Sequence, residues 1–296
     1  MKLFDLHCDT ATKLYYDATP FTSDSLQLSI HDISSWDTIT QVFACFSRPS
    51  LSDDAAFCSF FSMRRHLLNT LKHLATQHLF PILAVEDARL LGNSRKRLPL
   101  LHKAGVRILT LLWRGETVIG GAFDTNVGLS PFGKTILSDC FALGIVPDVS
   151  HASERSFYDV LEGGEGHGLL ASHSNARKIR NHPRNLTDTQ FLDLIHTNGL
   201  CGLSLCPAHL AERTATSDDL MRHIEHFLAL GGEDHLALGT DFDGIDTTPL
   251  DLRRNRDLFT LAEKMARIGY SDTLIHKLFW KNAENYFGKY KRQEAL

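Results

Sequence analysis

The stretch Phe80-Pro81-Ile82-Leu83-Ala84-Val85-Glu86 decides the fold, because an apolar run ends there on a carboxylate. A short apolar run between polar stretches is typical of a strand buried on both faces of a parallel sheet. The same pattern occurs along the whole chain. The predicted strands are Leu3–Cys8, Gln41–Phe46, Phe80–Val85, Val106–Leu111, Ile145–Val149, Leu169–Ser172, Leu200–Leu205 and Leu236–Gly239.

Stretches with helical periodicity separate these strands. They are Ala55–His78, Pro131–Leu143, Ser153–Leu161, Asp188–His196 and Ser217–Leu230, followed by segments within Asp257–Ile268, Asp272–Phe279 and Ala283–Phe287. Start signals at Ser130-Pro131 and Thr187-Asp188 support two of them. Eight alternating strands and helices predict an α/β fold, a (β/α)8 TIM-like barrel that forms one domain over residues 1–296. A doubly wound open sheet is the alternative, and Asp9–Ile39 reads as polar and irregular.

The composition fits a globular protein with one core. The chain has 296 residues, of which 43% are hydrophobic and 22% charged, with a formal net charge of −4. This balance argues against nucleic acid or an anionic membrane as the main partner. No window approaches the ~20 apolar residues of a membrane-spanning helix, so we expect a cytoplasmic protein without a membrane partner. Six scattered cysteines without a CxxC pair are expected to be reduced core residues: Cys8, Cys45, Cys58, Cys140, Cys201 and Cys206.

Metal-capable side chains fall at the carboxyl ends of five predicted strands. They are His7, Asp9, Glu86, His151, His173 and Asp241. His7 and Asp9 lie two residues apart on a strand, so their side chains share a face. Taken singly, each residue is better explained by a surface or core-edge role. Together they mark the end of a barrel where active sites are built.

The number of ligands indicates two metal ions. A single catalytic zinc takes three protein ligands and a water, whereas this set offers three histidines and at least two carboxylates. Glu86 is the best bridging ligand, because a carboxylate has two oxygen atoms. Nitrogen and oxygen ligands without thiolate favour zinc, with cobalt or manganese as alternatives. Cys8 lies between two ligands but is expected to point to the opposite side of its strand.

Several motifs, in this order, resemble the membrane dipeptidase family (renal dipeptidase-like, peptidase family M19) of the amidohydrolase superfamily. The resemblance runs from Asp5 to about Phe287. The motifs are Gly128-Leu129-Ser130-Pro131-Phe132-Gly133, Asp148-Val149-Ser150-His151, Ser172-His173-Ser174-Asn175-Ala176-Arg177, His182-Pro183-Arg184-Asn185-Leu186-Thr187-Asp188 and Gly239-Thr240-Asp241-Phe242-Asp243-Gly244. Each motif alone is only suggestive, whereas their combination is highly specific.

The resemblance implies roles for single residues. It implies one metal held by His7, Asp9 and Glu86, and a second held by Glu86, His151 and His173. Arg184 matches the arginine that binds the substrate carboxylate, a task suited to a planar guanidinium.

The resemblance also concerns three residues outside the metal ligands. Asp241 matches the family's acidic residue close to the metals, where it either accepts a proton from water or grips the substrate's amino group. Asp243 is expected to be structural. Trp113 stands where the family usually has a histidine that contacts the substrate. Because indole donates a hydrogen bond but takes up no proton, substrate preference is the property that this change puts in question.

The predicted activity is zinc-dependent hydrolysis of a dipeptide, with a C-terminal D residue suggested by the resemblance, through a hydroxide that bridges the metals. Asp241 and Glu86 are the predicted catalytic residues, and a homodimer is expected from relatives. One alternative is another amidohydrolase that acts on N-acyl amino acids or related small amides. An alternative of a different class is a non-catalytic metal-binding or ligand-sensing protein on the same scaffold.

Overall fold

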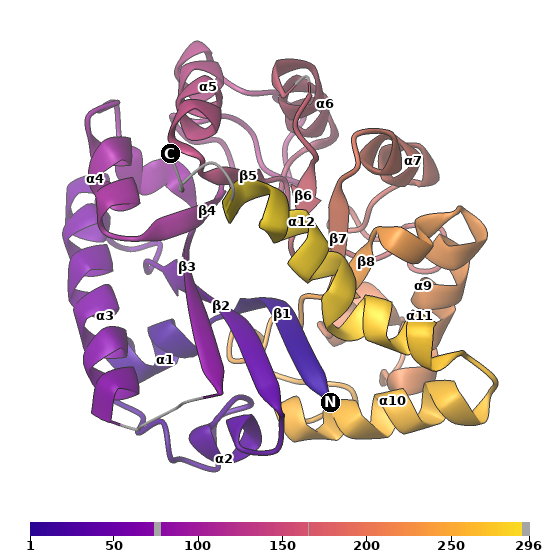
Figure 1. Ribbon diagram of the computed structural model, residues 1–296. Coiled ribbons are helices and arrows are strands. Elements are labelled where there is room, and N and C mark those ends of the chain that lie inside the picture. Colours follow the sequence, from indigo (N-terminus) through magenta and orange to yellow (C-terminus); the bar gives the residue numbers. More distant parts are fainter. Residues whose placement is uncertain (74–77, 165, 292–296) are drawn as a thin grey trace.

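The computed structural model describes residues 1–73, 78–164 and 166–291, and its centre is a closed barrel of eight parallel strands (Figure 1). Each strand pairs with the next along the chain, and β1 pairs with β8. The strands are β1 (Lys2–Cys8), β2 (Thr38–Phe46), β3 (Leu79–Glu86), β4 (Val106–Thr110), β5 (Val146–Asp148), β6 (Leu170–Ala171), β7 (Leu200–Leu203) and β8 (Leu236–Leu238). The barrel prediction is therefore confirmed, and the open sheet is excluded.

Helices surround the ring of strands (Figure 1). They are α1 (Thr10–Tyr16), α2 (Ile30–Ile33), α3 (Asp53–His73), α4 (Arg97–Lys103), α5 (Pro131–Leu143), α6 (Glu154–Gly163), α7 (Asp188–His196), α8 (Pro207–Leu210), α9 (Ser217–Ala229), α10 (Leu258–Arg267), α11 (Asp272–His276) and α12 (Asn282–Lys291). The two predicted start signals act as caps. The Ser130 hydroxyl accepts the N–H of Gly133, and Thr187 forms a capping box with Gln190.

The predicted segments and the structure are compared at three further places along the chain. Asp9–Ile39 is not irregular throughout, since α1 and α2 form the first crossover within it. The long helix α3 ends at His73, whereas residues 74–77 of the predicted helix lie outside the described residues. At the C-terminal end, a π-helical turn (Lys277–Lys281) joins α11 to α12, so two predicted segments form one continuous helical stretch.

The core has two layers, one on each face of the strands. The inner cluster takes at least one apolar side chain from every strand, including Leu6, Val42 and Ile108, together with residues of α12. The larger outer cluster packs the other strand faces against the helices. Phe287 of α12 stacks on Phe4 at 5.3 Å between ring centroids, so α12 covers the end of the barrel where the strands begin (Figure 1).

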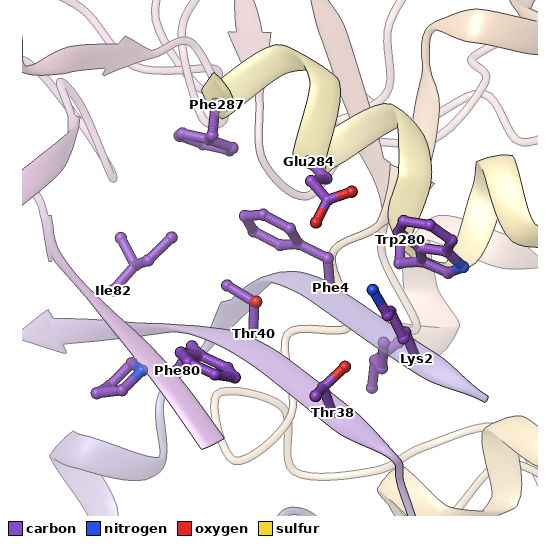
Figure 2. Close-up of a pocket in the computed structure, with 11 residues that line it drawn as sticks. Lys2, Phe4, Thr38, Thr40, Phe80, Ile82, Trp280, Glu284 and Phe287 are labelled. Carbon is purple, nitrogen blue, oxygen red and sulfur yellow. The ribbon is translucent and has the colours of Figure 1, made fainter. Parts of the chain in front are cut away.

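A cavity of about 510 Å³ lies at this same end, between α12 and the first residues of β1, β2 and β3 (Figure 2). Its lining is mostly apolar and aromatic, with Phe4, Phe80 and Trp280 among the side chains that surround the space. The described residues that line it include one carboxylate and neither histidine nor cysteine. The metal-capable residues instead belong to the opposite end, where the strands finish.

The structure also bears on the expectations about membrane-spanning helices and about the cysteines. Among the described residues, no helix combines the length and the apolar character needed to cross a bilayer. All six cysteines are free. Four are buried, whereas Cys58 on α3 is exposed and Cys206 is partly exposed. The prediction that all six are core residues is therefore wrong for these two. Cys58 lies on a part of α3 that faces solvent.

Candidate active site

An irregularity in β1 brings the first metal-capable residue into the barrel. Asp5 pairs with Gln41 of β2, but Cys8 pairs with Phe43, so β1 carries one extra residue between them. Such a bulge re-aims a side chain, and bulges are common beside active sites. As a result, His7 reaches the other strand ends, while Cys8 packs in the outer cluster as expected.

The structure brings five predicted ligands together as two groups that share Glu86. In the first group, His7 Nε2 lies 3.4 Å from Asp9 Oδ2 and 3.5 Å from Glu86 Oε2. In the second, His151 Nε2 lies 3.0 Å from Glu86 Oε1 and 2.9 Å from His173 Nε2. The two oxygens of Glu86 thus face different groups, which is the arrangement that a bridging carboxylate requires.

The chemistry of this cluster fits divalent cations. His7 Nε2 is buried and has no hydrogen-bond partner among the described residues. Burial, with the charge of Glu86 adding to it, raises the pKa of Asp9 to about 6. Burial raises the pKa of Asp241 to about 8, and the charges of Asp9 and Glu86 add to that effect against the opposing charge of His7. Buried carboxylates at this density need a positive charge nearby, and the imidazole and carboxylate donors suit zinc-type ions.

Hydrogen bonds fix which nitrogen of two histidines faces the cluster. His151 Nδ1 donates to the carbonyl oxygen of Trp113 at 3.0 Å, because a carbonyl can only accept. His173 Nδ1 lies 2.8 Å from Ser172 Oγ. Both rings therefore present Nε2 to Glu86, and such outer partners orient the ligands in metal sites.

His151 and Asp241 adopt left-handed backbone conformations, with φ of 70° and 64°. For residues with a Cβ atom, this conformation costs on the order of 1–3 kcal/mol and is found mainly at functional sites. Each residue comes three positions after the end of a strand, β5 for His151 and β8 for Asp241, and each approaches the ligand cluster. The backbone strain is therefore located where side chains must converge.

Arg184 lies beside the cluster and is only 5% exposed. Its Nη2 donates to the carbonyl oxygen of His173 at 3.4 Å, while Nε and Nη1 are buried and bond to nothing in the part of the chain that the structure describes. The guanidinium carbon lies 5.8 Å from the ring centre of Phe123. A buried guanidinium with free donors is suited to bind an anion from outside the chain.

Two histidines near Arg184 were not predicted as site residues. The rings of His182 and His209 lie 4.6 Å apart, and His182 also approaches Phe123 at 6.5 Å. Burial lowers the pKa of His209, and the charge of Arg184 lowers it further. His209 comes soon after β7, so the rule that selects polar residues after strand ends would have found it.

The remaining predicted residues occupy separate places. The Trp113 ring lies 4.8 Å from Phe46 and 6.4 Å from the ring of His151, so it borders the second group. Asp243 accepts hydrogen bonds from Thr10 Oγ1 at 2.6 Å and from the backbone N–H of Gln27 at 2.8 Å. These bonds join the β8 loop to the first crossover, which agrees with a structural role.

The chain matches a known protein family in sequence. The sequence model of the membrane dipeptidase family, peptidase family M19, matches residues 61–293. The chain belongs to this family. The resemblance read from the motifs is thus confirmed, and the protein is a hydrolytic enzyme of the metallopeptidase class.

Relatives are found among both sequences and solved structures. An uncharacterised protein of Klebsiella pneumoniae from the pqqA 5′ region is 34% identical over 67% of this chain and 77% of its own length. An uncharacterised dipeptidase of Schizosaccharomyces pombe is 29% identical over 75% of this chain, which spans just 56% of that relative. A metallopeptidase of Rhodobacter sphaeroides, solved with a phosphinate mimic of the dipeptide L-Ala-D-Ala, is 25% identical with a TM-score of 0.87 over 99% of both chains.

Proposed function

We propose that this enzyme hydrolyses the peptide bond of dipeptides, that it uses two divalent ions, and that zinc is its native metal. The observation that carries the proposal is the division of Glu86 between two groups, with Oε2 facing His7 and Oε1 facing His151. The family match supports a metal-dependent peptidase. The whole chain would then serve as one catalytic domain.

The residues that would hold the ions are those of the two groups. His7, Asp9 and Glu86 would hold one ion, and Glu86, His151 and His173 the other. When bound, such ions polarise the scissile carbonyl and lower the pKa of a water to about 7. The hydrogen bonds on His151 Nδ1 and His173 Nδ1 keep both Nε2 atoms free for this task.

Arg184 would bind the C-terminal carboxylate of the substrate. Its Nε and Nη1 atoms have no bond to the described residues, and each lies beside Nη2 in the planar fork with which a guanidinium binds a carboxylate. This contact fixes one end of a molecule of dipeptide length and holds the peptide bond over the metal-capable groups. The Rhodobacter sphaeroides relative was solved with a mimic of L-Ala-D-Ala, and we propose the same stereochemistry at the C-terminal residue here.

Asp241 would accept a proton from water and pass it to the leaving amine. Its carboxylate lies 3.9 Å from His7 Nε2, and its ligand atom forms a further close group with those of His7 and His173. Burial raises the pKa of Asp241 to about 8, which is near the range in which a group exchanges protons at neutral pH. Trp113 would border the substrate on the side of His151, with its indole N–H as a further donor.

Metal analysis combined with a substrate panel tests the proposal. Purified protein is analysed for bound metals and assayed on L,L dipeptides, L,D dipeptides and N-acyl amino acids, before and after chelation. We expect about two zinc ions per chain, activity on L,D dipeptides, and loss on chelation that zinc restores. Preference for N-acyl amino acids would replace the substrate assignment while leaving the metal assignment in place.

A further inference from the structure

Two buried aspartates, Asp5 on β1 and Asp148 on β5, lie just before metal-capable residues without belonging to either group. Both side chains are fully buried. The hydrogen bonds that they accept from the described residues come from neutral donors only: backbone N–H groups, hydroxyls and one amide. A buried charge with neutral partners is costly, so a role other than stabilising the fold has to be considered for both carboxylates.

Asp148 joins the ends of three neighbouring strands. Its Oδ1 accepts the backbone N–H groups of Ser150 at 3.0 Å and Ser172 at 2.9 Å. Its Oδ2 accepts the hydroxyls of Thr110 and Ser172, each at 2.6 Å. Thr110 ends β4, and Ser172 directly follows β6. One carboxylate thus joins the strand ends that present His151 and His173 to the end of the neighbouring strand β4.

The same carboxylate determines which ring nitrogen of a metal-capable histidine carries the proton. The Ser172 hydroxyl donates its single proton to Asp148, so it accepts from His173 Nδ1 at 2.8 Å. The proton of the His173 ring is therefore held on Nδ1, and Nε2 keeps its lone pair. That Nε2 atom lies 3.6 Å from Glu86 Oε1.

Asp5 makes an equivalent set of bonds on the other side of the barrel. Its Oδ1 accepts the backbone N–H of Thr240 at 2.9 Å and that of His7 at 3.4 Å. Its Oδ2 accepts the Thr240 hydroxyl at 2.6 Å and the Gln41 amide at 3.1 Å. These bonds join β8, β1 and β2, and they cover the bulge that turns His7 inward. Asp241 directly follows the clamped Thr240.

We propose that Asp5 and Asp148 are positioning residues, each of which prepares one half of the metal centre. Asp5 would set the site of His7 and Asp9, and Asp148 the site of His151 and His173. The inference rests on the proposed two-metal function. Each carboxylate fixes the backbone and side-chain geometry of its own half, and removing such outer partners typically lowers metal affinity by about 10–100-fold.

Zinc titration of the chelated full-length protein tests this division. In the wild type we expect two binding steps, which the variants His7→Ala and His151→Ala assign to the two halves. Asp148→Asn places an amide donor where Oδ2 accepts, so it should weaken the His151 step by about 10–100-fold and leave the other step unchanged. Asp5→Asn should weaken only the His7 step.

Asp219→Asn is the matched control. Asp219 is equally buried and accepts the backbone N–H of Thr216 at 3.0 Å and its hydroxyl at 3.3 Å, but it lies on α9 in the outer layer. Unlike Asp5 and Asp148, it also accepts from a charged donor, Arg213 Nη2 at 2.8 Å. This variant should lower the melting temperature while both zinc steps keep their wild-type affinity. It separates loss of a buried carboxylate in general from loss of one that acts on the metal centre.

The outcomes distinguish the inference from the proposed function. If Asp5→Asn and Asp148→Asn weaken both steps equally, or neither step, the division between halves is refuted. If Asp148→Asn does not fold, Ser172→Ala removes the hydroxyl that links the carboxylate to His173, and it should weaken the same step alone. If the wild type takes up no zinc, the proposed function fails, and this inference fails with it.

Discussion

Replacing Arg184 with methionine should increase stability and abolish recognition of the substrate carboxylate. The side chain is 5% exposed, and its Nε and Nη1 atoms are buried without partners. An unsatisfied buried donor costs about 1–3 kcal/mol, so an apolar side chain of similar length should remove much of this penalty. We expect a stability gain of about 1–3 kcal/mol, or roughly 2–6 °C in melting temperature at this chain length.

The functional loss follows from the same guanidinium group. A hydrogen bond to a charged group contributes about 1.5–3 kcal/mol, so two such bonds to a carboxylate contribute about 3–6 kcal/mol. At 1.36 kcal/mol per factor of ten, kcat/KM should fall by about 10²–10⁴. The contribution of Arg184 to binding a free C-terminal carboxylate is the quantity to be measured.

The assay compares L-Ala-D-Ala with its C-terminal amide, which lacks the carboxylate. The wild type should prefer the dipeptide by about 10²–10⁴ in kcat/KM, and Arg184→Met should hydrolyse both at similar low rates. Arg177→Met is the control, because Arg177 donates to the carbonyls of Asn185 and Pro183 and so holds the same loop. That variant should lose stability and keep the preference. An Arg184→Met enzyme that still prefers the free carboxylate would refute the assigned role.

Three further predictions concern substitutions of single residues. Asp241→Asn should lower kcat by at least about 10²-fold with zinc content unchanged, as measured by metal analysis beside steady-state kinetics, and unchanged turnover would remove Asp241 from the proposed mechanism. Gly239→Ala would place a Cβ atom on the carbonyl oxygen of Ser172, so it should cost about 1–3 kcal/mol and reduce zinc retention, as measured by melting and metal analysis. Burial lowers the pKa of His223 to about 4, so the folded state favours the neutral ring. The free energy of unfolding therefore has its full value above pH 6.5 and falls by about 3 kcal/mol as the pH is lowered to 4. Denaturant unfolding of the metal-free protein measures the free energy of unfolding at pH 7 and pH 4.5. The difference between the two pH values should be smaller by about 2–3 kcal/mol in His223→Gln than in the wild type, and an equal difference in both proteins would contradict this.

The barrel could be read from the sequence because its strands are buried on both faces. Runs such as Leu200–Leu205 are apolar at nearly every position and buried throughout. The structure places all eight predicted strands within a few residues of their predicted bounds. The crossover from Asp9 to Ile39 was not readable. Its helices α1 and α2 have seven and four residues, too short to show a clear period.

The residue types that stand at the strand ends could be found without the structure, because a parallel barrel places those ends together. His7, Glu86, His151 and His173 follow from this rule. Only the tertiary structure decided how they face one another. The bulge that turns His7 inward, and the hydrogen bonds from Asp148 through Ser172 to His173, depend on contacts between strands. Periodicity reports which face of a strand is buried, but it carries no information on register between strands or on the proton of a histidine ring.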